Sequence, residues 1–148
     1  MTKFTFRLES ILSIKMKLEE QAKMEFGAAK MKLNEEQEKL EGLYEKKNGY
    51  EEELKRLYSD DLDVRLINGT ARAIDIVEDQ IKLQKYAVKR AEKQVDLATQ
   101  KLNTVMQERK SMEKLKENRF AEYMREYNEE ESKQTDELIS YQYGKAED

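Results

Sequence analysis

The chain has 148 residues, of which 38% are hydrophobic and 41% are charged, and its formal net charge is −4. This balance leaves little apolar material for a globular core, and the negative charge argues against bulk nucleic-acid binding. Cysteine and histidine are both absent, which excludes disulfides, thiol nucleophiles and the commonest metal ligand and general base.

Strong helix formers dominate the sequence and proline is absent, a composition typical of a coiled coil or a long helix. We expect a first helix over about residues 5–58, capped by Thr5. From Leu8, positions at alternating steps of four and three form two lines, and eleven of these fifteen positions are apolar. The lines contain Leu8, Lys15, Ala22, Ala29, Glu36, Leu43, Tyr50 and Leu57, and Leu12, Glu19, Phe26, Leu33, Leu40, Lys47 and Leu54.

Four charged residues weaken this seam, namely Lys15, Glu19, Glu36 and Lys47. Near the first two, Ile11, Ile14 and Leu18 form an alternative apolar stripe, shifted by one residue. The sequence leaves both stripes open as the face that meets a partner helix.

A second helix is expected over about residues 63–142, followed by a frayed tail over 143–148. Its two seam lines contain Ile67, Ile74, Ile81, Val88, Val95 and Leu102, and Val77, Gln84, Ala91, Ala98, Val105 and Met112. Arg109 and Lys116 then interrupt the pattern. Apolar side chains resume in a shifted phase at Leu115, Phe120, Tyr123, Met124 and Tyr127.

Two stretches compete for the turn between the helices, residues 59–62 and Asn68-Gly69-Thr70. Asn-Gly-Thr is the stronger local turn signal, yet the seven-residue step of the second helix passes across it unbroken. The acids up to Asp63 also suit a helix N-terminus, so we place the turn at 59–62. The predicted fold is all-α and a single domain: an antiparallel coiled-coil hairpin of two long helices, the second longer with a C-terminal overhang.

A turn at this position pairs residues whose numbers add up to about 122 and leaves the end of the second helix without a partner. Phe120, Tyr123 and Tyr127 lie on that overhang, so they are candidate partner-binding residues.

Charge is unevenly distributed along the predicted hairpin. Residues 3–32 carry seven bases and four acids, and residues 89–119, which would pair with them, carry nine bases and five acids. Residues 33–88 carry nine bases and fourteen acids, and residues 120–148 carry three bases and nine acids. A coiled coil that is basic in one half and acidic in the other can be steered into an oriented encounter with a partner.

No glycine-rich phosphate loop, paired nucleophile and base, or metal-spaced carboxylates occur in the sequence. We therefore expect no catalytic, cofactor-binding or metal-binding residues, and a protein that is not an enzyme. No apolar stretch approaches the roughly 20 residues that span a bilayer, and the N-terminus lacks a signal-peptide core, so we expect a cytoplasmic protein.

Both ends of the sequence resemble the FliJ family of the bacterial flagellar export apparatus. The opening, from Lys3 to Lys15, contains Phe4-Thr5-Phe6-Arg7-Leu8-Glu9 followed by aliphatic residues, and the segment Lys133-Gln134-Thr135-Asp136-Glu137 is similar to the family's closing motif. The ladder Ile81, Val88, Ala91 and Val95 also resembles the family. The resemblance implies a stalk-like antiparallel coiled coil, similar to the central stalk of rotary ATPases.

FliJ proteins associate with the flagellar export ATPase hexamer and the export gate protein FlhA, and escort export chaperones. The resemblance therefore implies these partners, with peripheral association at the inner face of the cell membrane. It places candidate partner contacts at Leu43, Tyr50, Ala73, Val77, Gln80 and Gln84, and it equates Asp61 with a frequent glycine. A homodimeric coiled-coil scaffold and a rotary-ATPase stalk subunit are the alternatives.

Overall fold

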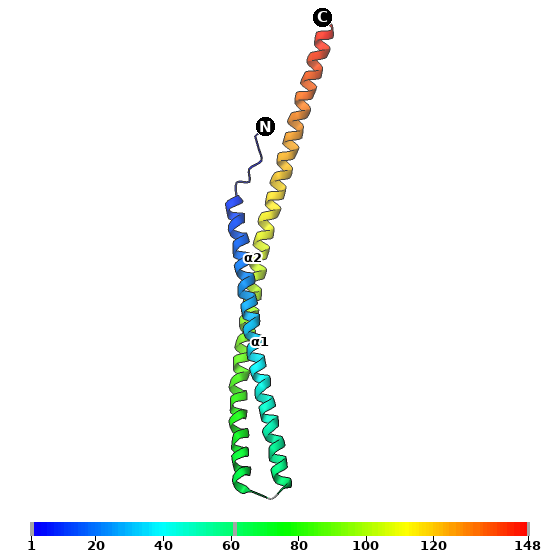
Figure 1. Ribbon diagram of the computed structural model, residues 1–148. Coiled ribbons are helices and arrows are strands. Elements are labelled where there is room, and N and C mark those ends of the chain that lie inside the picture. The colour runs from blue at the N-terminus through cyan, green and yellow to red at the C-terminus, as the bar shows by residue number, and fades with distance from the viewer. Residues whose placement is uncertain (1, 61, 148) are drawn as a thin grey trace. The chain divides into compact units, whose positions relative to one another are not determined.

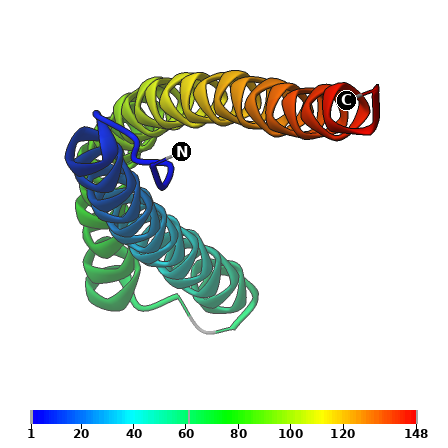
Figure 2. The ribbon, with the colours of Figure 1, turned by 90° about the horizontal axis from the view of Figure 1, so that it is seen from above.

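The computed structural model describes residues 2–60 and 62–147, and two helices contain most of them (Figure 1). Helix α1 is Glu9–Ser59 and helix α2 is Val64–Glu147, and no strand occurs among these residues. The helices run antiparallel and pack against each other, as predicted. Figure 2 shows α1 beside the first part of α2 from a second direction.

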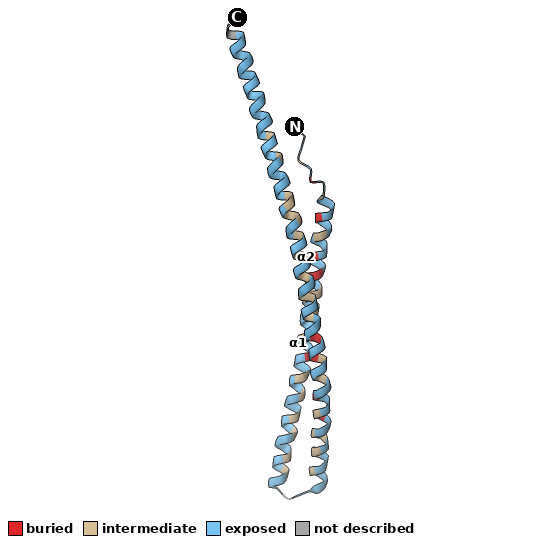
Figure 3. Cartoon of the chain, turned by 180° about the vertical axis from the view of Figure 1, so that it is seen from behind, coloured by how far each residue is buried: buried red, intermediate tan, exposed pale blue. Residues whose placement is uncertain are grey.

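The chain divides into two compact units, each built from both helices. One comprises Met1–Glu20 with Thr104–Asp148, and the other is Gln21–Asn103, which contains the link between α1 and α2. Figure 3 colours the chain by burial: few residues are buried, and most of both helices is exposed.

The heptad seam predicted from the sequence is the interface. All fifteen predicted positions from Leu8 to Leu57 and all twelve from Ile67 to Met112 are buried or half-buried. The most buried apolar side chains are Leu12 and Ala22 of α1 and Val77 and Ile81 of α2. A seven-residue repeat keeps one face of each helix toward the other, which explains why the pattern identifies the packed face.

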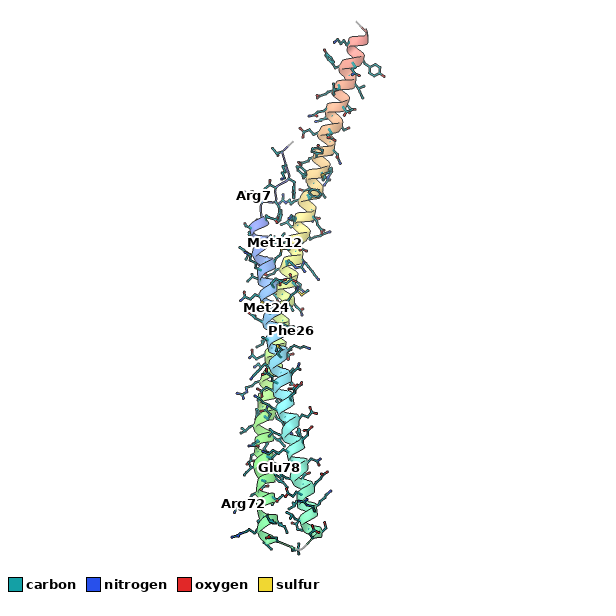
Figure 4. The ribbon with its side chains drawn as sticks, viewed as in Figure 1. Arg7, Met24, Phe26, Arg72, Glu78 and Met112 are labelled. Atoms are coloured by element: carbon teal, nitrogen blue, oxygen red, sulfur yellow. The ribbon has the colours of Figure 1, made fainter. Side chains whose placement is uncertain are left out.

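The alternative stripe of Ile11, Ile14 and Leu18 is wrong, because these side chains are 41%, 55% and 40% exposed. The charged positions stay in the seam instead, because α2 supplies partners to them. Lys15 Nζ lies 2.8 Å from Glu108, and Glu19 pairs with Arg109. Lys47 Nζ lies 3.4 Å from Glu78, a residue that is labelled in Figure 4.

Arg109 and Lys116, which interrupt the apolar line in the sequence, still lie on the packed face of α2. Both residues are half-buried and stay on the line that runs at seven-residue steps from Ile67 to the half-buried Tyr123. Each meets an acid of α1, since Arg109 pairs with Glu19 and Lys116 Nζ lies 2.8 Å from Glu9. The pattern continues because charge complementarity replaces apolar contact at these two steps.

Interhelical pairs show the alignment of the helices. In the ion pairs and side-chain hydrogen bonds between α1 and α2, the residue numbers of the partners add up to between 120, for Glu36 with Gln84, and 128, for Glu19 with Arg109. The value of about 122 expected from the turn position lies within this range.

The start of α1 and the end of α2 both differ from the sequence-based expectation. Helix α1 begins at Glu9, whose N–H donates to the carbonyl of Phe6 at 3.1 Å, so Thr5 lies too early to cap it. Phe6 is buried, and the described residues before it are not helical. Helix α2 continues to Glu147, past the expected end near 142.

Helix α2 begins at Val64 with Asp63 as its N-cap. Oδ1 of Asp63 accepts hydrogen bonds from the N–H groups of Arg65, at 3.1 Å, and Leu66, at 3.4 Å. Asn68-Gly69-Thr70 lies inside α2, so the helical break falls between Ser59 and Val64. Asp61, equated with the family's glycine, lies outside the described residues.

We predict that Asp63→Ala lowers the free energy of unfolding by about 1 kcal/mol, because it removes the acceptor for two N–H groups of the first turn. Urea unfolding followed by circular dichroism measures the loss. Asp60→Ala is the matched control, and an equal loss in both variants would contradict the capping role.

We predict that Ile81→Ala lowers the free energy of unfolding by about 2–5 kcal/mol, because Ile81 is 5% exposed and its truncation leaves a cavity in the seam. Leu83→Ala serves as the control on the same helix, since Leu83 is 70% exposed. The same urea titration compares the two, and similar midpoints would show that the seam is not the core.

Candidate partner-binding surfaces

Three of the six residues implied by the family resemblance line one groove. Leu43, Gln80 and Gln84 border a groove of ≈ 740 Å³ between α1 and α2, together with Lys39, Gly42, Lys46, Leu83, Ala87 and Arg90. The other three lie apart from it: Tyr50 and Ala73 are half-buried and Val77 is 2% exposed. Val77 therefore belongs to the interface between the helices.

Gln84 joins a polar layer inside the seam. Its Nε2 donates to the backbone carbonyl of Glu36 at 2.9 Å and to the Glu36 carboxylate. Lys32 Nζ lies 2.9 Å from the same carboxylate. The hydrogen bonds from Lys32 and then Gln84 lower the pKa of Glu36 below its ordinary value, because they stabilise the charged form.

A second polar layer lies nearer the start of α1, at Glu19. Arg109 pairs with Glu19 across the interface, and its Nη1 lies 2.7 Å from Glu113 on its own helix. Glu19 is 6% exposed. Hydrogen bonds to Glu19 and Glu113 raise the pKa of Arg109, so the guanidinium stays charged throughout the stable range of the protein.

The aromatic candidates Phe120, Tyr123 and Tyr127 form one cluster on α2. Ring centroids lie 6.3 Å apart for Phe120 and Tyr123, and 6.2 Å apart for Tyr123 and Tyr127. A hydrogen bond to Glu131 raises the pKa of Tyr127. Aromatic rings stacked along a helix form an amphipathic surface of the kind found in binding sites.

This cluster has a partner within the chain, contrary to the expected bare overhang. The centroid of Phe4 lies 5.2 Å from that of Phe120 and 5.5 Å from that of Tyr123, and the Tyr123 hydroxyl donates to the carbonyl of Thr2 at 2.8 Å. The sequence did not reveal this contact, because residues 2–8 are not helical and do not follow the heptad pattern.

Beyond the cluster, every described side chain of α2 from Asn128 to Lys145 is exposed. The apolar ones include Leu138, Ile139, Tyr141 and Tyr143, at 61%, 46%, 65% and 71% exposure. Within the described residues, no group of three or more acids is placed to hold a metal ion.

A comparison with models of protein families matches the flagellar FliJ protein over residues 4–148. The chain belongs to the FliJ family. No curated protein and no solved structure matched it. As a FliJ-family protein, it is a component of the flagellar export apparatus. The FliJ family is a family of structural components and is not known for catalysis.

In the part of this FliJ-family chain that the structure describes, neither helix contains a stretch apolar enough to cross a membrane.

We predict that Glu36→Gln destabilises this FliJ-family protein at neutral pH and that the difference from the wild type disappears in acid. A carboxyl with a depressed folded-state pKa stabilises the fold above its unfolded pKa of about 4.3, and that contribution is lost as the pH falls through the folded pKa. Urea midpoints between neutral and acidic pH test this.

Glu38→Gln is the control, because Glu38 is exposed on the same helix. A constant difference between Glu36→Gln and wild type at every pH would show that packing, and not charge, underlies the effect.

Proposed function

We propose that this chain is a non-enzymatic stalk of the flagellar export apparatus that binds the export ATPase hexamer and links it to the export gate protein FlhA. Family membership supports the apparatus, and the charge distribution of the hairpin supports the mode of binding. The basic segments 3–32 and 89–119 enter the ATPase ring, and the half nearer the link meets the gate.

The observation that carries this proposal is how acids are used in the basic segments. Six of the nine acids in these segments form ion pairs, and four of these pairs join α1 to α2. The six are Glu9, Glu19, Glu25, Glu108, Glu113 and Glu117. Bases such as Lys17 and Lys110 stay exposed. Because the two segments carry sixteen bases and nine acids, the surface that they offer to a partner has an excess of positive charge.

The groove that contains Leu43, Gln80 and Gln84 is our candidate contact for FlhA. Tyr50, Ala73 and Val77, which the family resemblance also implies, do not line this groove and would contact FlhA separately. The aromatic cluster of Phe120, Tyr123 and Tyr127 is a candidate contact for the ATPase or for export chaperones. Association with the inner face of the membrane would then occur through these partners.

We predict that Lys17→Glu/Lys110→Glu weakens binding to the cognate export ATPase by about tenfold and reduces any stimulation of its hydrolysis, because both changes place negative charge on the basic surface. Lys55→Glu/Arg65→Glu, with the same change in net charge elsewhere, should bind as the wild type does. Titration calorimetry, hydrolysis rates and hexamer formation provide the readouts.

Binding of the basic-surface variant should also be less sensitive to salt than that of the wild type. If the wild-type chain neither binds the ATPase nor changes its hydrolysis or assembly, the stalk proposal is wrong.

A further inference from the structure

Helix α2 keeps two half-buried side chains after its contact with α1 ends. Lys116 pairs with Glu9, which is the first residue of α1. From residue 117 to residue 145 every residue of α2 is exposed except Tyr123 and Tyr127, which are half-buried and stack on each other. These two rings therefore mark where α2 still has a neighbour beyond the start of α1.

That neighbour is the N-terminal strap, by which we mean residues 2–5. The strap is not helical, and it lies in the same compact unit as this part of α2. The ring centroid of the half-buried Phe4 lies 5.2 Å from that of Phe120 and 5.5 Å from that of Tyr123. The carbonyl of Thr2 accepts a hydrogen bond of 2.8 Å from the Tyr123 hydroxyl. The strap thus contacts the row of aromatic rings on α2.

The strap is held by its aromatic contact more than by continuous packing or by charge. Phe4 borders two depressions, of ≈ 590 Å³ and ≈ 540 Å³. Arg7, labelled in Figure 4, lines the larger one together with Glu122 and Glu126 of α2, but all three are exposed, and exposed charges attract each other weakly. Phe6 is 8% exposed, so the chain stays anchored there when the strap detaches.

The end of α2 depends on such an anchor for its order. Residues 128–147 carry six acids and two bases, and the described side chains among them are all exposed. An isolated helix of about 20 residues is only marginally stable in water, because nucleation is costly. Here the helix continues from an ordered turn instead, so fraying from its end stops at the last turn that tertiary contacts hold.

We propose that the N-terminal strap is a conformational latch that sets how far order extends along α2. With the strap closed, Tyr123 and Tyr127 are held and fraying stops at about Tyr127. With the strap open, the last held residue is Lys116, paired with Glu9, and α2 frays from residue 117 onward. The end of α2 therefore changes between a stiff helix and a flexible arm while the heptad seam stays intact. The latch does not depend on the export ATPase or on FlhA.

The test is hydrogen–deuterium exchange of the full-length chain, read by mass spectrometry, in wild type and in Phe4→Ala. Phe4 lies outside α2, so this substitution leaves the intrinsic helix propensity of α2 unchanged. Amides of residues 118–127 should exchange at least tenfold faster in Phe4→Ala, whereas amides of residues 104–116 should keep wild-type rates. Lys3→Ala, an exposed residue of the same strap, is the matched control and should exchange as the wild type does.

A second variant reports the strap directly. Phe4→Trp keeps an aromatic ring and should protect residues 118–127 as the wild type does. Because the sequence contains no other tryptophan, its fluorescence comes from the strap alone. Adding Phe120→Ala/Tyr123→Ala should shift this emission to the red, since the indole then faces water. Adding Tyr141→Ala, which removes an exposed ring elsewhere on α2, should leave the emission unchanged.

Four results would overturn the latch. They are equal exchange of residues 118–127 in Phe4→Ala and wild type, equally fast exchange in Lys3→Ala, wild-type exchange there as fast as in an unstructured peptide, and an emission that ignores Phe120→Ala/Tyr123→Ala. Faster exchange that spreads through the seam in Phe4→Ala would also overturn it, because the strap would then stabilise the whole fold. The ATPase assay with Lys17→Glu/Lys110→Glu does not involve the strap, so each proposal can fail without the other.

Discussion

Everything in this structure depends on the heptad interface between α1 and α2, in which charged side chains occupy core positions. Glu19 and Glu36 are 6% and 7% exposed, and each has a hydrogen-bonding partner on α2. Such layers add less stability than apolar packing, but they make misaligned pairing costly, because a shifted helix would leave a buried charge without its partner. They therefore fix the alignment of the hairpin.

This use of acids inside the interface also shapes the surface. Where α1 acids are paired with α2 bases, the exposed charge that remains in segments 3–32 and 89–119 is positive. Pairing removes Glu19 and Glu36, which are buried, from the outer surface.

Much of the fold could be predicted, because a seven-residue repeat follows directly from helix geometry and the need to bury one face. It predicted which residues face the partner helix, including Lys47 and Gln84, and its change of phase near residue 60 indicated the break. The candidate sites were less accessible. Val77 would lie on the same heptad line of α2 whether its side chain packs between the helices or contacts a partner protein. Periodicity alone therefore cannot distinguish the two roles.

The sequence by itself determined the helical class, the seam and the distribution of charge, because these depend on local propensity and spacing. Only the tertiary structure decided which charged residues pair, since Glu19 with Arg109 joins positions ninety residues apart. It also decided that residues 2–8 leave the helix and place Phe4 on Phe120 and Tyr123. That contact depends on where a non-helical segment meets α2, and no repeat in the sequence encodes such a meeting.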